Sequence, residues 1–207
     1  MSEPQIVSFR RMQDGTKADY DMLGKLEAEH AKKLPGRVLR ELQDLAHGLS
    51  GYAVDRLEHS LISATMAERD GADLDWIVTA LIHDIGDNLA PSNHDGLAAM
   101  IGAPYLREEC TWVMKTHGIF QLKYYGHHTG ADPDAREKFK GHPSYQTAID
   151  FCEHWDQTAF DPDFKYQPLS HFEPMLQEVF TRPAWDKRFT RPGERVGLGR
   201  TMAAAAE

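Results

Sequence analysis

Cysteine, long apolar runs and an excess of positive charge are all lacking from this 207-residue sequence. The two cysteines, Cys110 and Cys152, are too few for a disulfide scaffold and lack the paired spacing of a zinc ribbon. No stretch reaches the roughly 18 apolar residues of a transmembrane helix, and residues 1–20 lack the apolar core of a signal peptide. We therefore expect free thiols in a soluble, cytoplasmic protein with no membrane partner.

The charge balance excludes a further class of partner. The chain has 23 Lys and Arg against 32 Asp and Glu, which gives a formal net charge of −9. Without a basic field to attract a phosphodiester backbone, no nucleic-acid partner is expected. Hydrophobic residues make up 41% of the chain, which suffices for the core of one domain over residues 1–207. Histidine, by contrast, is abundant, with 11 residues.

Apolar residues recur with the period of an α-helix along most of the chain, and alternating strand-like runs are missing. Glycine and proline turn signals separate the segments. We predict an all-α helical bundle with a core at about residues 51–183, N-terminal helices within residues 17–47 and a partly extended tail at residues 184–207, which frays at Thr201–Glu207. The expected helices are Lys17–Lys32, Gly36–His47, Val54–Asp70, Asp73–Ile85, His94–Ile101, Pro104–His117, Pro143–Phe160 and Leu169–Phe180.

Polar residues on apolar helix faces indicate a possible metal site. His59 shares a helical face with Ile62 and Met66, although a lone inward histidine is more often a satisfied core residue than a ligand. The next predicted helix ends in His83-Asp84, where an imidazole and a carboxylate can converge on one cation or bridge two. An uncompensated Asp84 would be costly to bury there, so a cation is the expected partner.

Three more ligand candidates follow along the chain. His94 and His117 lie at predicted helix ends, and Asp156 lies on the inward face of its predicted helix. The alternative for Asp156 is a buried carboxylate that pairs with an arginine or caps a helix. Asp150 and His154 lie on other faces of that helix and are weaker candidates.

These residues carry a resemblance to a known family. The order His59, His83-Asp84, His94, His117 and Asp156, with an HDIG run at residues 83–86, resembles the HD-domain superfamily. Most of its members are metal-dependent phosphohydrolases, but one branch comprises mixed-valent diiron oxygenases, among them myo-inositol oxygenase and the oxygenases that cleave organophosphonates. The chain is similar to that branch around residues 57–60, 96–99 and 155–160, and the resemblance spans about residues 51–183.

The resemblance implies an HD-domain bundle that holds an Fe(II)/Fe(III) pair and acts on a small molecule with O2, without an organic cofactor. The reaction it implies is oxidative cleavage of a C–C or C–P bond next to a hydroxylated carbon. The implied ligands are His59, His83, Asp84 and Asp156 for one iron, and Asp84, His94 and His117 for the other, with Asp84 as the bridge. A phosphohydrolase acting on a nucleotide or phosphate ester, and a non-catalytic metal-stabilised sensor, remain as alternatives.

Asp87 departs from the family pattern, because Lys or His often follows H-D-x-x. A carboxylate repels a phosphonate. Asp87 therefore either orients a cationic side chain, accepts a hydrogen bond from a ligand histidine, or faces an ammonium group of the substrate, and the second interpretation is favoured. Because His127 and His128 are close in the chain to His117, either could replace it as a ligand. The candidate substrate-binding residues are Arg56, Lys123, Tyr124 and His127, and the candidate catalytic residues are Asp84, Asp87 and Tyr52.

The segment Gly118–Gly130 is too rich in aromatic residues and histidine for an ordinary surface loop. It either packs over the mouth of the bundle or forms a pocket wall. In the second case Tyr124 or Tyr125, together with Tyr52 on the helix that carries His59, would face a quaternary ammonium group. In the organophosphonate-cleaving relatives a tyrosine of that helix can occupy the open iron position, which makes Tyr52 a candidate for this role. The implied substrate is a 1-hydroxyphosphonate; one that carries a trimethylammonio group would give glycine betaine and phosphate.

Overall fold

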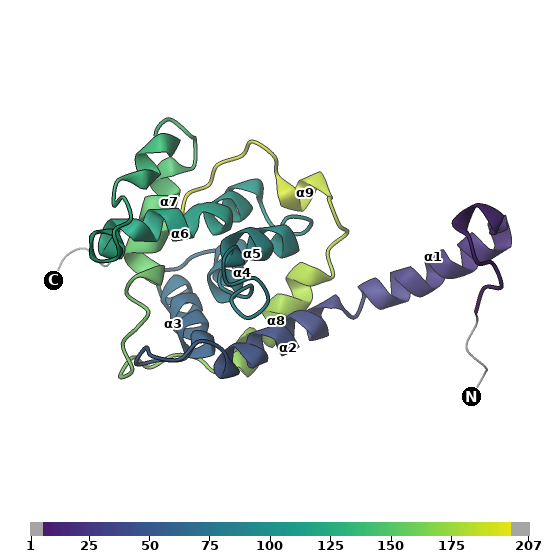
Figure 1. Cartoon of the computed structure of the whole chain (residues 1–207), viewed down its shortest axis with the longest axis horizontal. Helices are drawn as coiled ribbons and strands as arrows, with labels where there is room; N and C mark the ends of the chain where they lie inside the picture. Colours follow the sequence, from purple (N-terminus) through teal and green to yellow (C-terminus); the bar gives the residue numbers. More distant parts are fainter. Residues whose placement is uncertain (1–5, 200–207) are drawn as a thin grey trace.

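The structure is a computed structural model that describes residues 6–199, and every regular element in that range is helical (Figure 1). The predicted all-α class is confirmed, whereas the predicted fraying of Thr201–Glu207 lies outside the described residues. Among the described residues no helix is both long and apolar enough to cross a membrane. The α-helices are α1 Lys17–Ala31, α2 Leu34–Asp44, α3 Arg56–Arg69, α4 Leu74–Ile82, α5 His94–Gly102, α6 Glu108–Thr129, α7 Tyr145–Phe151, α8 Leu169–Phe180 and α9 Lys187–Thr190. Short 3-10 turns are η1 Met12–Asp14, η2 Leu45–His47 and η3 Ala135–Phe139, and η4 Cys152–Asp156 is one π-helical turn.

Helix α4 lies at the centre of the bundle, and every residue from Asp75 to Ile82 is buried. Its sequence is apolar on nearly all faces, so it must be surrounded by other elements. Helices α3, α6 and α8 pack around it (Figure 1). The rings of Trp76 and Trp155 meet edge to face, with centroids 6.3 Å apart, and join α4 to η4. His83 and Asp84, which follow directly on α4, therefore lie at the end of a buried central helix.

The prediction for the middle of the chain is wrong at two boundaries. The sequence predicts a helix at Pro104–His117 and assigns no helix to Gly118–Gly130, whereas α6 begins at Glu108 and continues to Thr129. Gly118 does not end the helix; the stop comes at Gly130, which adopts a left-handed φ of 77° as the cap. The aromatic and histidine-rich segment is therefore helical.

Two further elements differ from the prediction. The helix expected over Pro143–Phe160 is regular only from Tyr145 to Phe151 and then widens into η4, a kind of turn that is frequent at functional sites. Helix α3 begins at Arg56, because the Asp55 side chain accepts a hydrogen bond from the Glu58 backbone in a capping box. Tyr52 consequently lies in the preceding loop and not on the helix that carries His59.

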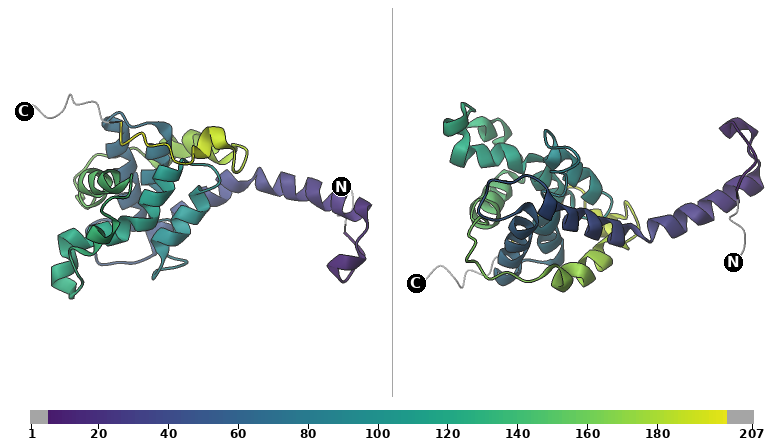
Figure 2. Two further views of the ribbon diagram at one scale, coloured as in Figure 1. Left: turned by 90° about the horizontal axis from the view of Figure 1, so that it is seen from above. Right: turned by 60° about the horizontal axis from the view of Figure 1, so that its bottom comes forward.

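The two ends of the described chain differ in how they contact the bundle. Helix α1 projects away from the other helices, and none of its 15 residues is buried (Figures 1 and 2). The tail predicted at residues 184–207 contains the short helix α9 and then runs without regular structure to residue 199. Buried Glu109 holds this segment, since its carboxylate accepts a hydrogen bond of 2.8 Å from the Val196 backbone.

Candidate metal centre

All six predicted metal ligands meet in one place between α3, α4, α5, α6 and η4. His59 comes from the middle of α3, His83 caps α4 and Asp84 follows it, His94 begins α5, His117 lies in the middle of α6, and Asp156 ends η4. Five of these side chains are buried, and that of His94 is 26% exposed. The central position of α4 explains the convergence, because neighbouring elements can aim side chains at its end.

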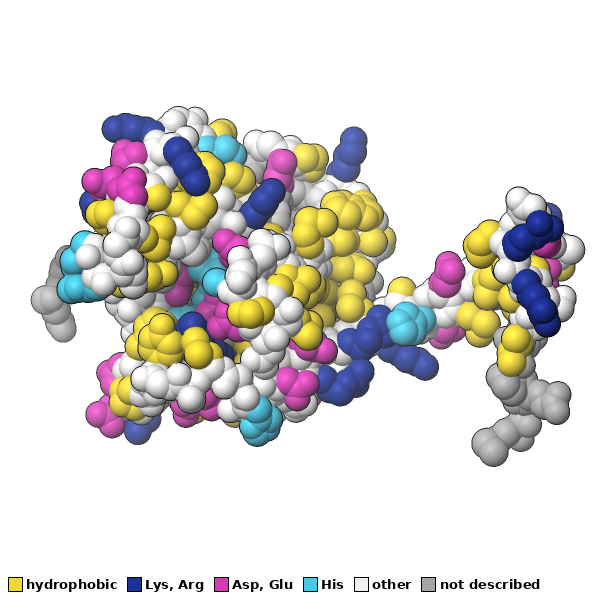
Figure 3. Space-filling view, in the orientation of Figure 1, with side chains coloured by type: hydrophobic (Ala, Val, Ile, Leu, Met, Phe, Trp, Pro, Cys, Tyr) yellow, Lys and Arg dark blue, Asp and Glu magenta, His cyan; other side chains and the backbone are white. Residues whose placement is uncertain are grey.

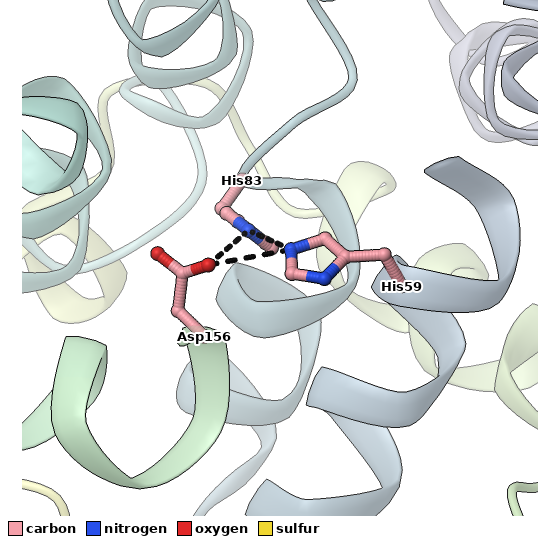
Figure 4. Close-up of side chains that lie close together, drawn as sticks. All are labelled: His59, His83 and Asp156. Carbon is pink, nitrogen blue, oxygen red and sulfur yellow. Dashed lines mark hydrogen bonds and ion pairs between the residues drawn. The ribbon is translucent and has the colours of Figure 1, made fainter. Parts of the chain in front are cut away.

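The deeper half of the centre contains His59, His83 and Asp156 (Figure 4). The two Nε2 atoms lie 3.1 Å apart, and Asp156 Oδ1 lies 3.3 Å from that of His59 and 3.5 Å from that of His83. Ligand atoms about 2.1 Å from one cation, at angles of about 90–110°, lie roughly 3.0–3.4 Å from each other. The three side chains therefore have the spacing of ligands around a single metal ion.

Backbone contacts orient the imidazole rings toward one another. The Nδ1 atoms of His59, His83 and His117 donate to carbonyl oxygens at 3.1, 2.8 and 2.7 Å, respectively. Donation from Nδ1 leaves the lone pair on Nε2, which is how metal-bound histidines are usually held. Since lone pairs of His59 and His83 at 3.1 Å repel each other, a proton or a metal cation must lie between them.

Asp84 joins the deeper half to the outer half. Its Oδ2 lies 3.5 Å from His59 Nε2 and 3.6 Å from His83 Nε2. Its Oδ1 lies 3.4 Å from His94 Nε2 and 3.2 Å from His117 Nε2. One carboxylate thus presents one oxygen to each pair of histidines. Three groups could hold a metal ion, namely His59 with His83 and Asp156, His83 with Asp84 and His117, and Asp84 with Asp87 and His94.

Without a metal, protons replace the missing positive charge. Burial opposes ionisation of Asp84, but His83, His117 and His59 hold the pKa of this carboxyl well below its usual range. Burial also opposes a charge on His83, yet Asp84 and Asp156 raise the pKa of His83 to about 9. The carboxylates are therefore ready for a cation, and a metal ion must displace a proton from His83.

A cavity of about 360 Å³ opens onto the outer half of the centre. Figure 3 shows histidine and acidic side chains at the bottom of a hollow on this face. His59 and His83 are not among the described residues that line the cavity, so a molecule reaches the centre from the side of His94 and His117. The lining residues are Tyr52, Arg56, Asp84, His94, His117, Gly118, Gln121, Tyr124, Tyr125, Asp156, Gln157 and Phe160.

Arg56 and Asp87 form a mostly buried ion pair beside the centre. Arg56 Nε lies 2.7 Å from Asp87 Oδ2, and Asp87 Oδ1 lies 3.5 Å from His94 Nδ1. The second contact is longer than a good hydrogen bond. The sequence favours a bond from a ligand histidine to Asp87, but the closest contact of Asp87 is with a cationic side chain. Because Arg56 occupies that oxygen, the interpretation of Asp87 as an ammonium site loses support.

Arg56 also contacts the cavity wall and the bridging carboxylate. Its Nη1 lies 3.5 Å from Asp84 Oδ2, and its guanidinium lies 4.9 Å above the ring of Tyr52. Tyr52, which was expected to face a substrate ammonium, thus has one face of its ring in contact with Arg56. Tyr124 does line the cavity, and burial raises the pKa of Tyr124 to about 12, so its hydroxyl is a hydrogen-bond donor near neutral pH.

The remaining candidates lie away from the centre. Lys123 is 43% exposed, pairs with Asp134 at 2.8 Å and does not line the cavity. His127 and His128 are in the exposed last turn of α6, about 15 Å beyond His117 along the helix. Neither can replace His117 as a ligand, and the structure gives His127 no place in the cavity wall.

Sequence reasoning missed two wall residues, Gln121 and Phe160, for different reasons. Gln121 lies one helical turn after His117, so a continuous α6 would have placed it on the same face. Phe160, from the segment after η4, stacks on His59 with ring centroids 4.4 Å apart. No sequence signal indicates that contact, which depends on how the chain turns after η4.

No model of a protein family matches the chain, and no curated protein matches it.

Proposed function

We propose that this chain is an HD-domain diiron oxygenase that uses O2 to cleave the C–P bond of a 1-hydroxyphosphonate. The observation that carries the proposal is the position of the Asp84 carboxylate, whose two oxygens face two separate pairs of histidines. A centre of four imidazoles and two carboxylates suits iron among the transition metals. Two iron ions held there would supply one-electron redox chemistry and open coordination positions for O2 and a substrate oxygen.

The protein side chains give the two halves of the centre different tasks. The half with His59 and His83 is buried and has Asp156 as a further ligand, and of these three only Asp156 lines the cavity, so its ion would be the less accessible of the two. The half with His94 and His117 has fewer protein ligands and faces the cavity. A substrate hydroxyl would therefore bind in the outer half, where coordination positions remain free.

Arg56 is suited to hold the anionic end of the substrate. It is the single Lys or Arg among the described residues that line the cavity, and it lies beside Asp84. Its pair with Asp87 fixes the guanidinium, which can still present donors to a phosphonate oxygen. Tyr124 and Tyr125 also line the cavity and would face a trimethylammonio group, if the substrate carries one.

The overall reaction balances with O2 as the one oxidant. A 1-hydroxyphosphonate and one O2 give one carboxylic acid and one phosphate, and the carbon that loses phosphorus is oxidised to the acid. The aromatic walls, which include Phe160, would limit the access of bulk water while the bond is cleaved.

The test uses the iron-loaded protein after partial reduction with ascorbate. Low-temperature electron paramagnetic resonance is expected to show a coupled Fe(II)/Fe(III) signal that changes when a 1-hydroxyphosphonate is added. O2 uptake and phosphate release should then occur in equal amounts. Two bound iron ions that give no such signal under any reduction condition would refute the oxygenase proposal.

A metal-dependent phosphohydrolase is the second candidate, and the place of Arg56 next to a two-metal site favours it. In that case a metal-activated water would attack a phosphate ester bound to Arg56. Phosphate release from such an ester with Mn(II) in the absence of O2 would support this candidate and oppose the first.

A further inference from the structure

The N-terminal arm, which we define as residues 6–33, makes almost no contact with the rest of its own chain. Helix α1 extends away from the bundle, and none of its 15 residues is buried (Figures 1 and 2). An isolated helix of this length is marginal in water. Its local support includes a capping box between Thr16 and Asp19 and an exposed pair between Lys17 and Asp21. Contacts with another surface would therefore stabilise the arm.

The arm carries a disproportionate share of exposed apolar side chains. At its tip the Tyr20 ring packs on Phe9 with centroids 5.7 Å apart, and the Tyr20 hydroxyl donates to the Met12 carbonyl. Figure 3 shows apolar side chains at this tip. Isolated exposed apolar residues need no explanation, but a group on one projecting element indicates an interaction surface. Among residues 6–199, eleven large hydrophobic residues are exposed, and four of them lie here, namely Ile6, Met12, Tyr20 and Leu26.

The base of the arm contains a hollow of about 500 Å³. Leu23, Leu26 and Ala31 line it from the arm, and Leu34 and Tyr105 line it from the bundle. The same element thus has an apolar protrusion at one end and a largely apolar hollow at the other. Such self-complementarity is what a two-fold symmetric interface requires.

The charge distribution also favours a second copy of this chain as the partner. The arm contains six Lys and Arg against five Asp and Glu, whereas residues 34–207 contain 17 against 26. A segment with a net charge of +1 is therefore attached to a strongly acidic bundle. In a pair of copies, the arm of each would lie against the acidic bundle of the other, where opposite charges attract.

We infer that two copies of the chain exchange arms about a two-fold axis, so that the tip of each arm occupies the hollow at the base of the other. The inference is independent of the metal centre, which lies in the bundle. It requires a dimer in solution that depends on the apolar residues of α1.

Light scattering on the full chain tests the dimer. The expected mass is twice 23.4 kDa for the unaltered protein and 23.4 kDa for Leu26→Glu. Met100→Glu is the matched control, because Met100 is 67% exposed on α5, outside the arm, and this variant should remain a dimer. Circular dichroism should show all three proteins folded, since Leu26 is not part of the core. A mass of one chain for the unaltered protein, or an equally stable dimer for Leu26→Glu, would overturn the inference. In the first case the partner of the arm would be its own bundle or a different macromolecule.

Cross-linking tests the arrangement of the arms. Cys110 and Cys152 are buried, so introduced surface thiols react selectively. Oxidation of a mixture of Met12→Cys and Ala31→Cys chains should link the two different variants, because each tip would lie at the base of the other arm. A mixture of Met12→Cys and Met100→Cys should not form such links. If the control mixture links and the first does not, arm exchange is wrong.

Discussion

Asp84 Oδ1 lies 3.2 Å from His117 Nε2, while the other oxygen of the same carboxylate faces His59 and His83. This relationship makes Asp84 the one described residue that contacts both pairs of histidines. Asp84 is only 4% exposed, so water could not replace these contacts if they were lost. If two metal ions bind, both depend on this side chain.

Asp84→Ala should therefore remove both metal ions and not just one. The expected metal content falls from two ions to near zero per chain, because each half of the centre loses a ligand and the shared negative charge. Elemental analysis after metal loading and desalting provides the measurement. Retention of one ion would show that Asp84 is a ligand without being a bridge.

The raised pKa of His83 predicts opposite effects of pH on the metal-free and the metal-loaded protein. In the metal-free fold the pKa of His83 is about 9, above its ordinary value of 6.5. The resulting stabilisation is full below about pH 6.5 and is lost as the pH rises through about 9. A metal ion must displace this proton, so metal affinity should instead increase with pH over the same window, by about tenfold per unit for one proton.

Thermal melts and metal titrations between pH 6.5 and 9 measure the two trends. His83→Gln is the reference, because it removes the titrating group. The melting temperature of the metal-free protein should approach that of the variant as the pH rises. Equal pH dependence of the two metal-free proteins would contradict the role given to His83.

Arg56 and Lys123 provide a matched pair for testing substrate binding. Arg56→Gln should raise KM by about 10–100-fold, since a charged hydrogen bond contributes roughly 1.5–3 kcal/mol. Lys123→Gln should leave KM unchanged, because Lys123 pairs with Asp134 outside the cavity. Metal content should be normal in both variants. A larger effect of Lys123→Gln than of Arg56→Gln would mean that substrate binds elsewhere.

The sequence predicts the helical class, and the six residues that it offers as ligands lie together in the structure. The helical period indicates that His59 and Asp156 point inward. His83 and Asp84 follow on α4, which is apolar on nearly all sides and can only be central. The complete set of six, which includes His94 and His117, is what the resemblance to the HD-domain superfamily implies. Gly118, by contrast, is a weak stop signal within a helix whose actual cap is Gly130.

The cavity wall could not be predicted in the same way. Its composition depends on contacts between distant segments, such as Phe160 against His59, and on the π-helical turn that rotates Asp156 into the centre. The role of Asp87 illustrates the limit. Its position next to the HDIG run indicates the metal centre, but its pair with Arg56, 31 residues earlier in the chain, appears only in three dimensions.

Asp87→Asn decides whether Asp87 is a metal ligand or a positioning residue. Asp87, Asp84 and His94 lie close enough to hold an ion together. However, Nε2 of His94 faces Asp84, whereas Nδ1, on the other side of the ring, faces Asp87. An ion bound to Nε2 together with Asp84 would therefore lie on the opposite side of the imidazole from Asp87, whose second oxygen is held by Arg56 at 2.7 Å.

We accordingly expect Asp87→Asn to retain two metal ions and to lose substrate affinity, because Arg56 loses its anchor. The free energy of unfolding should fall by about 1–3 kcal/mol, the range for a buried polar group that loses its partner. Asp134→Asn is the control, since it breaks the exposed pair with Lys123 and should change neither metal content nor KM. If Asp87→Asn instead loses one ion and retains the other, Asp87 is a ligand of the outer site. Arg56 would then pair with a metal ligand.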